Sequence, residues 1–185
     1  VELLSKLRIL FQKISETAAV LGVGALIATS IYVAVDVICR RAFGLSFVGT
    51  DELAGYAFAA IVGWGACFAF LSGGLIRVDV IYERLPVAFR AWLDVLAVLS
   101  TFIFALVLAW NAVHLGLESL TFNNVSNTPL RVPLWIPQIV WGAGFFALAL
   151  SSFLIFVEAL LLAILGRHEQ ATVIVKSTEN EEISA

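Results

Sequence analysis

The sequence carries very little charge for its length. Of its 185 residues, 14% are charged and 61% are hydrophobic, and the mean hydropathy is +1.00. Soluble domains have about a quarter charged residues and about half apolar ones. A chain of this size cannot bury such an apolar excess in its own core. The composition therefore excludes an ordinary soluble domain and indicates that lipid covers much of the surface.

Residues that build catalytic and metal sites are also scarce. The chain has two histidines and two cysteines. We expect His114 and His168 on opposite sides of the membrane, which argues against a haem held between two imidazoles. Cys39 and Cys67 should lie at different depths, so we expect no disulfide. No spacing indicates a metal site or a phosphate-binding loop, so we expect no enzyme, no cofactor and no nucleic-acid partner.

Four long runs contain no charged residue. They hold 19, 24, 23 and 26 residues, and their flanking charges are Glu16 and Asp36, Glu52 and Arg77, Asp94 and Glu118, Arg131 and Glu158. A helix needs about 20 apolar residues to cross a bilayer, and lipid-exposed backbone must be helical to satisfy its polar groups. The sequence predicts an all-α membrane protein with spans at about 16–39, 51–73, 91–117 and 137–163.

The distribution of Lys and Arg predicts the orientation. The N-terminal segment, the connection between the second and third spans and the tail hold eight of these residues, against three in the other two loops. Cytoplasmic loops carry the excess of positive charge. We therefore expect both termini in the cytoplasm and the loops at 40–50 and 118–136 outside.

The flanking segments differ from the four-helix domain, which we place at 1–165. Apolar residues at helical spacing near the start predict either an amphipathic helix on the inner surface or a cytoplasmic extension of the first span. The mixed segment 74–90 is too polar to span, which indicates an interfacial stretch ending at Pro86. The polar tail at 166–185 has the composition of a disordered segment.

Small residues recur in the second span at a spacing that suits helix packing. Gly55, Ala59, Gly63 and Cys67 are four residues apart, and Gly65, Ala69 and Gly73 form an adjacent stripe. Such patterns let helix backbones approach closely in lipid. We interpret the first stripe as a helix-packing surface or a partner interface. With two stripes, one neighbour could lie inside this chain and the other on a partner.

A few polar residues have predicted local roles. Asp36 and Arg40 are spaced to form an ion pair on one helix face. Thr50 is a candidate cap for the second span, and Asn111 is expected to bond a neighbouring helix. The charged residues predicted outside are candidates for docking a soluble partner, and they are Arg40, Arg41, Asp51, Glu52 and Arg131.

Several motifs together resemble one family, the small membrane subunit of tripartite ATP-independent periplasmic (TRAP) transporters. The motifs are Asp51-Glu52-Leu53-Ala54, Gly63-Trp64-Gly65-Ala66, Ile76-Arg77-Val78-Asp79, Leu85-Pro86 with Arg90, Ser126-Asn127-Thr128-Pro129 and Val132-Pro133-Leu134-Trp135-Ile136-Pro137. Their order covers nearly the whole chain. The family often has His two residues before the Arg-Val-Asp element, where this chain has Leu75. Arg77 and Asp79 are the candidate residues of that inner element.

The resemblance implies a scaffold subunit in a bacterial inner membrane. In such a system a periplasmic binding protein captures an organic acid, and a large multi-span subunit carries the substrate and the coupling sodium ions. The small subunit would brace the large one and help dock the binding protein, in contact with membrane lipids. The lack of charges at mid-depth in the four runs agrees with that division of labour.

Three alternatives remain open from the residues alone. One is the small subunit of another tripartite carboxylate uptake system. Another is the membrane anchor of a redox enzyme, which a haem spectrum would reveal. The third is a small channel or exporter acting as a homo-oligomer, which would transport by itself in liposomes.

Overall fold

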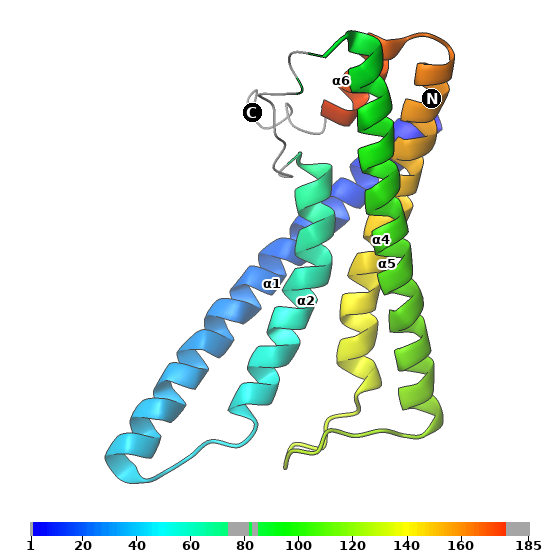
Figure 1. Cartoon of the computed structure of the whole chain (residues 1–185). Helices are drawn as coiled ribbons and strands as arrows, with labels where there is room; N and C mark the ends of the chain where they lie inside the picture. The colour runs from blue at the N-terminus through cyan, green and yellow to red at the C-terminus, as the bar shows by residue number, and fades with distance from the viewer. Residues whose placement is uncertain (1, 74–81, 83–84, 177–185) are drawn as a thin grey trace.

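The computed structural model describes residues 2–73, 82 and 85–176, and nearly all of its regular structure is helical (Figure 1). Within these ranges the structure defines five helices: α1 (Glu2–Phe43), α2 (Thr50–Leu71), α4 (Val87–Thr121), α5 (Trp135–Ile164) and α6 (His168–Lys176). The described residues form no strand, although Val125 and Pro133 make an isolated antiparallel bridge.

The predicted all-α membrane architecture with four spans is confirmed. α1, α2, α4 and α5 are each long and apolar enough to cross a bilayer. Each helix contains almost all of its predicted span, and α1, α4 and α5 extend beyond theirs at both ends. α1 is one continuous helix of 42 residues, about 63 Å long at 1.5 Å per residue. That continuity fits the extension of the first span rather than a separate surface helix.

The spans form two helical hairpins that meet through α2 and α5. α1 packs against α2, α4 packs against α5, and α2 packs against α5. The 44–49 and 122–134 loops lie together at one end of the molecule, which we call the loop end (Figure 1). α6 and the start of α1 lie toward the opposite, terminal end. In the most apolar 18-residue stretch of each helix, 44% of the residues of α5 are buried, compared with 11% of those of α1. α5 is therefore the central helix and α1 the peripheral one.

The contact between α2 and α5 is a close approach of two backbones. A Cβ atom on Gly63 would lie 2.5 Å from the carbonyl oxygen of Trp141, and one on Gly144 would lie 2.5 Å from the backbone of Gly63. No real Cβ atom is accommodated at that distance. Trp64 reinforces the crossing, because its indole Nε1 donates a hydrogen bond of 2.9 Å to the carbonyl of Val140.

Small side chains continue this packing toward the terminal end. Cys67 is fully buried, and its thiol lies beside the hydroxyls of Ser15 on α1 and Ser151 on α5. On the loop-end side of Gly144, α4 and α5 also approach closely, because a Cβ on Gly142 would lie 2.8 Å from the Cβ of Ala112. Three helices therefore meet around Cys67, and both cysteines are free thiols.

One expectation is corrected in part by the helices. The tail at 166–185 is predicted to be disordered, but His168–Lys176 form α6, which packs against α4 and α5 and buries Ala171 and Val175. Residues 177–185 lie outside the described residues. α5 ends in a left-handed Gly166 that turns the chain back on itself. Asn111 is predicted to bond a neighbouring helix, and within the described residues its Nδ2 donates to the carbonyl of Val107 in its own helix at 2.7 Å.

Most of the predicted interfacial stretch at 74–90 lies outside the described residues, and so do Arg77 and Asp79. Its described end agrees with a boundary at Pro86, which is the N-cap of α4. Tyr82 donates a hydrogen bond of 2.6 Å to the buried carboxylate of Asp94. That bond satisfies an acid about two turns into α4.

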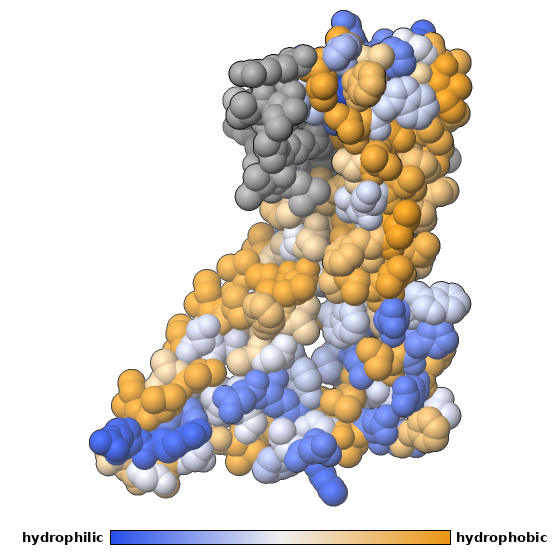
Figure 2. Space-filling view, viewed as in Figure 1, coloured by the Kyte–Doolittle hydropathy of each residue, from blue (hydrophilic) through white to orange (hydrophobic). Residues whose placement is uncertain are grey.

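The exposed surface is apolar along the helices and polar at the loop end (Figure 2). Large apolar side chains are exposed along much of α1, among them Val20, Leu21, Ile27, Ile31 and Ile38. In water such a surface would be an aggregation hazard. In a bilayer it is the surface expected of a spanning helix that lipid or another subunit covers.

The helix crossing predicts a sharp difference between two glycines of α2. Gly63→Ala should lower the free energy of unfolding by about 1–3 kcal/mol, because the added methyl group meets the Trp141 carbonyl. Gly55→Ala should be neutral or stabilising by up to about 1 kcal/mol, because nothing lies within 4 Å of its Cβ position and Ala favours the helix. Thermal unfolding of both variants in detergent, monitored through the reactivity of the buried Cys67 thiol, measures the difference. Equal stability of the two variants would contradict the close approach.

Candidate functional site at the loop end

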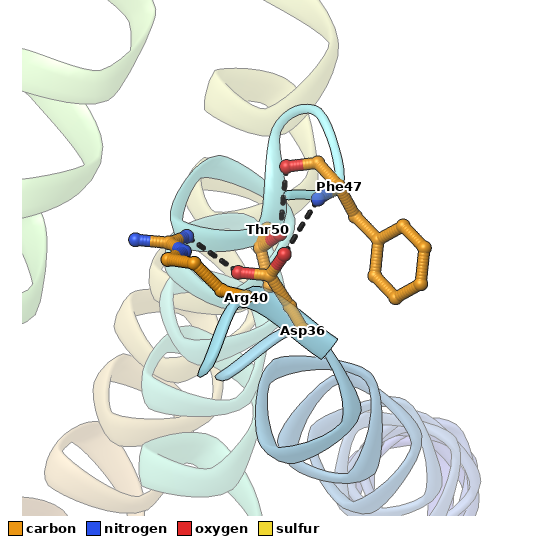
Figure 3. A network of polar contacts seen from close by, with 4 residues as sticks. All are labelled: Asp36, Arg40, Phe47 and Thr50. Carbon is orange, nitrogen blue, oxygen red and sulfur yellow. Dashed lines mark hydrogen bonds and ion pairs between the residues drawn. The ribbon is translucent and has the colours of Figure 1, made fainter. Parts of the chain in front are cut away.

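Asp36 organises the turn between α1 and α2 (Figure 3). The residue is 2% exposed. Its Oδ2 pairs with the Arg40 guanidinium at 2.5 Å, so the predicted ion pair is confirmed. Its Oδ1 accepts the backbone N–H of Phe47, also at 2.5 Å. The sequence pattern predicted the first partner and missed the second, because Phe47 lies eleven residues away in an irregular loop.

The same turn is closed by two further contacts. The Thr50 hydroxyl donates to the Phe47 carbonyl at 3.3 Å, and the rings of Tyr32 and Phe47 stack with centroids 5.6 Å apart. The prediction that Thr50 caps α2 is wrong. The N-cap is Gly49, no side chain caps the helix, and Thr50 is the first helical residue. The loop thus folds over the carboxylate of Asp36 and shields it.

Glu52 joins the two hairpins. One carboxylate oxygen accepts the hydroxyl of Tyr56 one turn along α2, and the other accepts the hydroxyl of Thr128 in the 122–134 loop. Ser126 lies 2.7 Å from the Thr128 hydroxyl and extends the chain of hydrogen bonds. Thr128 was named within a polar motif, but no sequence signal linked it to an acid 76 residues away.

Gly49 marks a second contact between the hairpins. Its φ of 77° is left-handed, and an added Cβ would overlap the side chain of Leu130. Leu130 is held by a compact loop in which the Ser126 N–H bonds the Val132 carbonyl at 2.9 Å. The Arg131 N–H bonds the Thr128 carbonyl at 3.1 Å, and Arg131 itself has a φ of 48°. Strain at a non-glycine residue is tolerated here because the loop is bonded on both sides.

The structure divides the five charged docking candidates into two groups. Glu52 is part of the joint between the hairpins. Arg40 forms an ion pair with Asp36, although 59% of its side chain is exposed. Arg41, Asp51 and Arg131 are exposed. In the described part of the chain, these three side chains have no ion-pair partner. They are therefore the residues of the group that remain available to a partner.

The packing candidates in α2 are divided as well. Gly63 and Cys67 are buried against α5 and the terminal part of α1. Ala59 is half-buried, and Gly55 is exposed with open space at its Cβ position. The first stripe therefore serves packing inside the chain at its terminal half. Nothing in the described structure fills the space beside Gly55.

Comparison with known proteins finds one family model that matches this chain. The family model described as the DctQ component of tripartite ATP-independent periplasmic transporters matches residues 29–162. The match runs from the second half of α1 to near the end of α5. No curated protein and no solved structure matches the chain.

The Asp36 turn predicts a local effect of a single substitution. Asp36→Ala should leave the Phe47 N–H without its acceptor and cost about 1–3 kcal/mol. Hydrogen exchange should show the Phe47 amide losing protection while amides in the middle of α5 keep theirs. Asp51→Ala is the matched control, since it removes an exposed acid of the same loop region. Unchanged protection at Phe47 in Asp36→Ala would refute the role of this carboxylate.

The Glu52–Thr128 bond predicts an energetic coupling between hairpins. In a double-mutant cycle of Glu52→Ala and Thr128→Val, we expect a coupling energy of about 1–3 kcal/mol, as for hydrogen bonds to charged groups. Chemical unfolding in detergent measures each variant. Tyr56→Phe provides a comparison, since it removes a bond within α2 alone. Additive effects at Glu52 and Thr128 would mean that the bond contributes nothing to the joint.

Proposed function

Because the chain belongs to the family of DctQ components of tripartite ATP-independent periplasmic transporters, we propose that it is the scaffold subunit of a sodium-coupled uptake system for an organic acid. In this proposal a large multi-span subunit carries the substrate and the sodium ions. The chain lies in a bacterial inner membrane with both termini in the cytoplasm. The loop end then faces the periplasm, where a substrate-binding protein docks.

The single observation that carries the scaffold role, beyond the family, is how the two hairpins are joined. The Gly63–Gly144 crossing fixes α2 on α5 within the membrane, and the Glu52–Thr128 bond ties the hairpins at the loop end. Two separated attachment points resist rotation of one hairpin against the other. A rigid body of this kind suits a subunit that braces a partner while the partner moves.

The four spanning helices also favour a supporting role over a transporting one. Substrate and ion pathways in membranes use ionisable groups near mid-depth or helices broken there. Within the described spans, α1, α2, α4 and α5 are continuous, and the buried acids Asp36 and Asp94 lie within two or three turns of helix ends. The large subunit would supply the pathway.

Docking would use the exposed charges of the loop end. Arg41, Asp51 and Arg131 present both signs of charge, which orients a partner and raises the rate of encounter. Glu52 is a poor choice for this role because its two oxygens already accept hydrogen bonds within the chain. Replacement of Glu52 should therefore lower stability, whereas replacement of Asp51 should affect docking without lowering stability.

The docking proposal is tested by charge reversal. Asp51→Lys with Arg131→Glu should lower uptake by about fivefold or more at limiting binding protein and recover at saturating binding protein, because surface charges act mainly on association. Uptake by reconstituted complex in liposomes is the measurement. The control is Glu16→Lys, an exposed charge far from the loop end in the sequence. Normal uptake at limiting binding protein would reject this docking surface.

The scaffold proposal has its own test. Mild-detergent purification of the tagged chain should recover a much larger multi-span protein at about equal stoichiometry. Recovery of the chain alone would reject the scaffold role, and a haem spectrum would indicate a redox anchor instead.

A further inference from the structure

One face of α4 points away from the rest of the chain and is polar in its half toward the loop end. The residues Ser100, Phe104, Val107, Asn111, His114 and Glu118 recur every three or four positions, which places them on one helix face. All six are exposed. No other described helix packs on them along the half that holds Asn111 and His114.

Two of these polar residues lie at hydrocarbon depth. Leu106 is the midpoint of the uncharged run between Asp94 and Glu118. Asn111 and His114 are five and eight residues beyond it, or about 8 Å and 12 Å along the helix. Half of the hydrocarbon core is about 15 Å thick. Both side chains therefore lie where lipid tails, which cannot form hydrogen bonds, would surround an isolated chain.

Neither side chain is fully hydrogen-bonded within the described residues. Asn111 uses one N–H on the Val107 carbonyl, and its Oδ1 has no partner in the described structure. His114 packs edge-on against the Trp110 ring with centroids 4.9 Å apart, and its ring nitrogens make no hydrogen bond to a described residue. Unsatisfied polar groups are costly in hydrocarbon, so lipid is a poor cover for this face.

The exposed face of α1 has the opposite character. Its large side chains are apolar, among them Val20, Ile27 and Ile31. Its hydroxyls are satisfied locally, since Thr29 and Ser30 both bond carbonyls of the preceding turn. Lipid suits that face. The contrast between α1 and α4 distinguishes a surface suited to lipid from a surface suited to protein.

A groove runs beside the polar face of α4 toward the terminal end. It has a volume of about 390 Å³ and lies between Ala66 and Ala69 of α2 and Ser100 and Phe104 of α4, with Leu148 of α5 at its base. The small residues at its walls permit close approach of another helix. The groove and the polar face form one continuous strip, because Ser100 and Phe104 belong to both.

We propose that this strip, from the α2–α4 groove to Glu118, is the seat of one transmembrane helix of the large subunit. The inference rests on the proposed scaffold function and specifies its interface. The partner helix is apolar where it lies in the groove. It carries a hydrogen-bonding side chain at the depth of Asn111 and His114, which satisfies both.

Photo-crosslinking in native membranes tests the location without disturbing the fold. p-Benzoylphenylalanine replaces Phe104 or Asn111 on α4, and Ile27 or Ile31 on α1 as matched controls. We expect adducts with the large subunit from the α4 positions and none from the α1 positions. Adducts with the large subunit from α1 alone, or adducts of α4 with a second copy of this chain, would overturn the inference.

A second experiment separates this inference from the proposed function. Asn111→Leu with His114→Leu should reduce recovery of the large subunit about threefold to tenfold, as expected for interhelical hydrogen bonds in lipid. Ser30→Leu on α1 is the matched control and should recover it normally. If the unmodified chain recovers no large subunit, the scaffold function fails. If it recovers the subunit and the α4 variant does so equally well, this interface alone is wrong.

Discussion

The structure depends on the close approach of α2 and α5 at Gly63 and Gly144. Each glycine lies where a single methyl group would collide with the backbone of the other helix. Spanning helices gain little from hydrophobic association within lipid, so packing contacts of this kind must hold them together. Because α2 is the helix through which the α1–α2 hairpin joins α5, loss of this contact would separate the hairpins over most of the membrane.

The loop end reinforces the crossing with hydrogen bonds to carboxylates. Asp36 secures the turn of one hairpin internally, and Glu52 connects that hairpin to the loop of the other. Both acids lie near helix ends, where water or lipid head groups limit the cost of charge, and both are bonded on two oxygens. Acids in these positions stabilise the loop end, while Arg41, Asp51 and Arg131 remain exposed on its surface.

The outward surfaces differ in what can cover them. α1 offers an apolar face with its hydroxyls bonded internally, which a bilayer accommodates. On α4, Asn111 and His114 are not fully hydrogen-bonded within the described residues, and we infer that both lie at the depth of lipid tails. A small membrane subunit that braces a larger one would be expected to show such asymmetry, with one side for lipid and another for its partner. A lipid-facing side and a partner-facing side agree with the membership of this chain in a family of transporter components.

The sequence by itself determined the four spans, the family and the Asp36–Arg40 pair, because charge-free length and i, i+4 spacing are local properties of a helix. Tertiary structure alone decided the partners of Glu52 and the difference between buried Gly63 and exposed Gly55. It also decided the packing of α6, a segment whose composition had indicated disorder. These depend on residues far apart in the chain. A stripe of small residues indicates that another helix can approach closely. Only the packed fold shows along which part of the stripe a neighbouring helix lies.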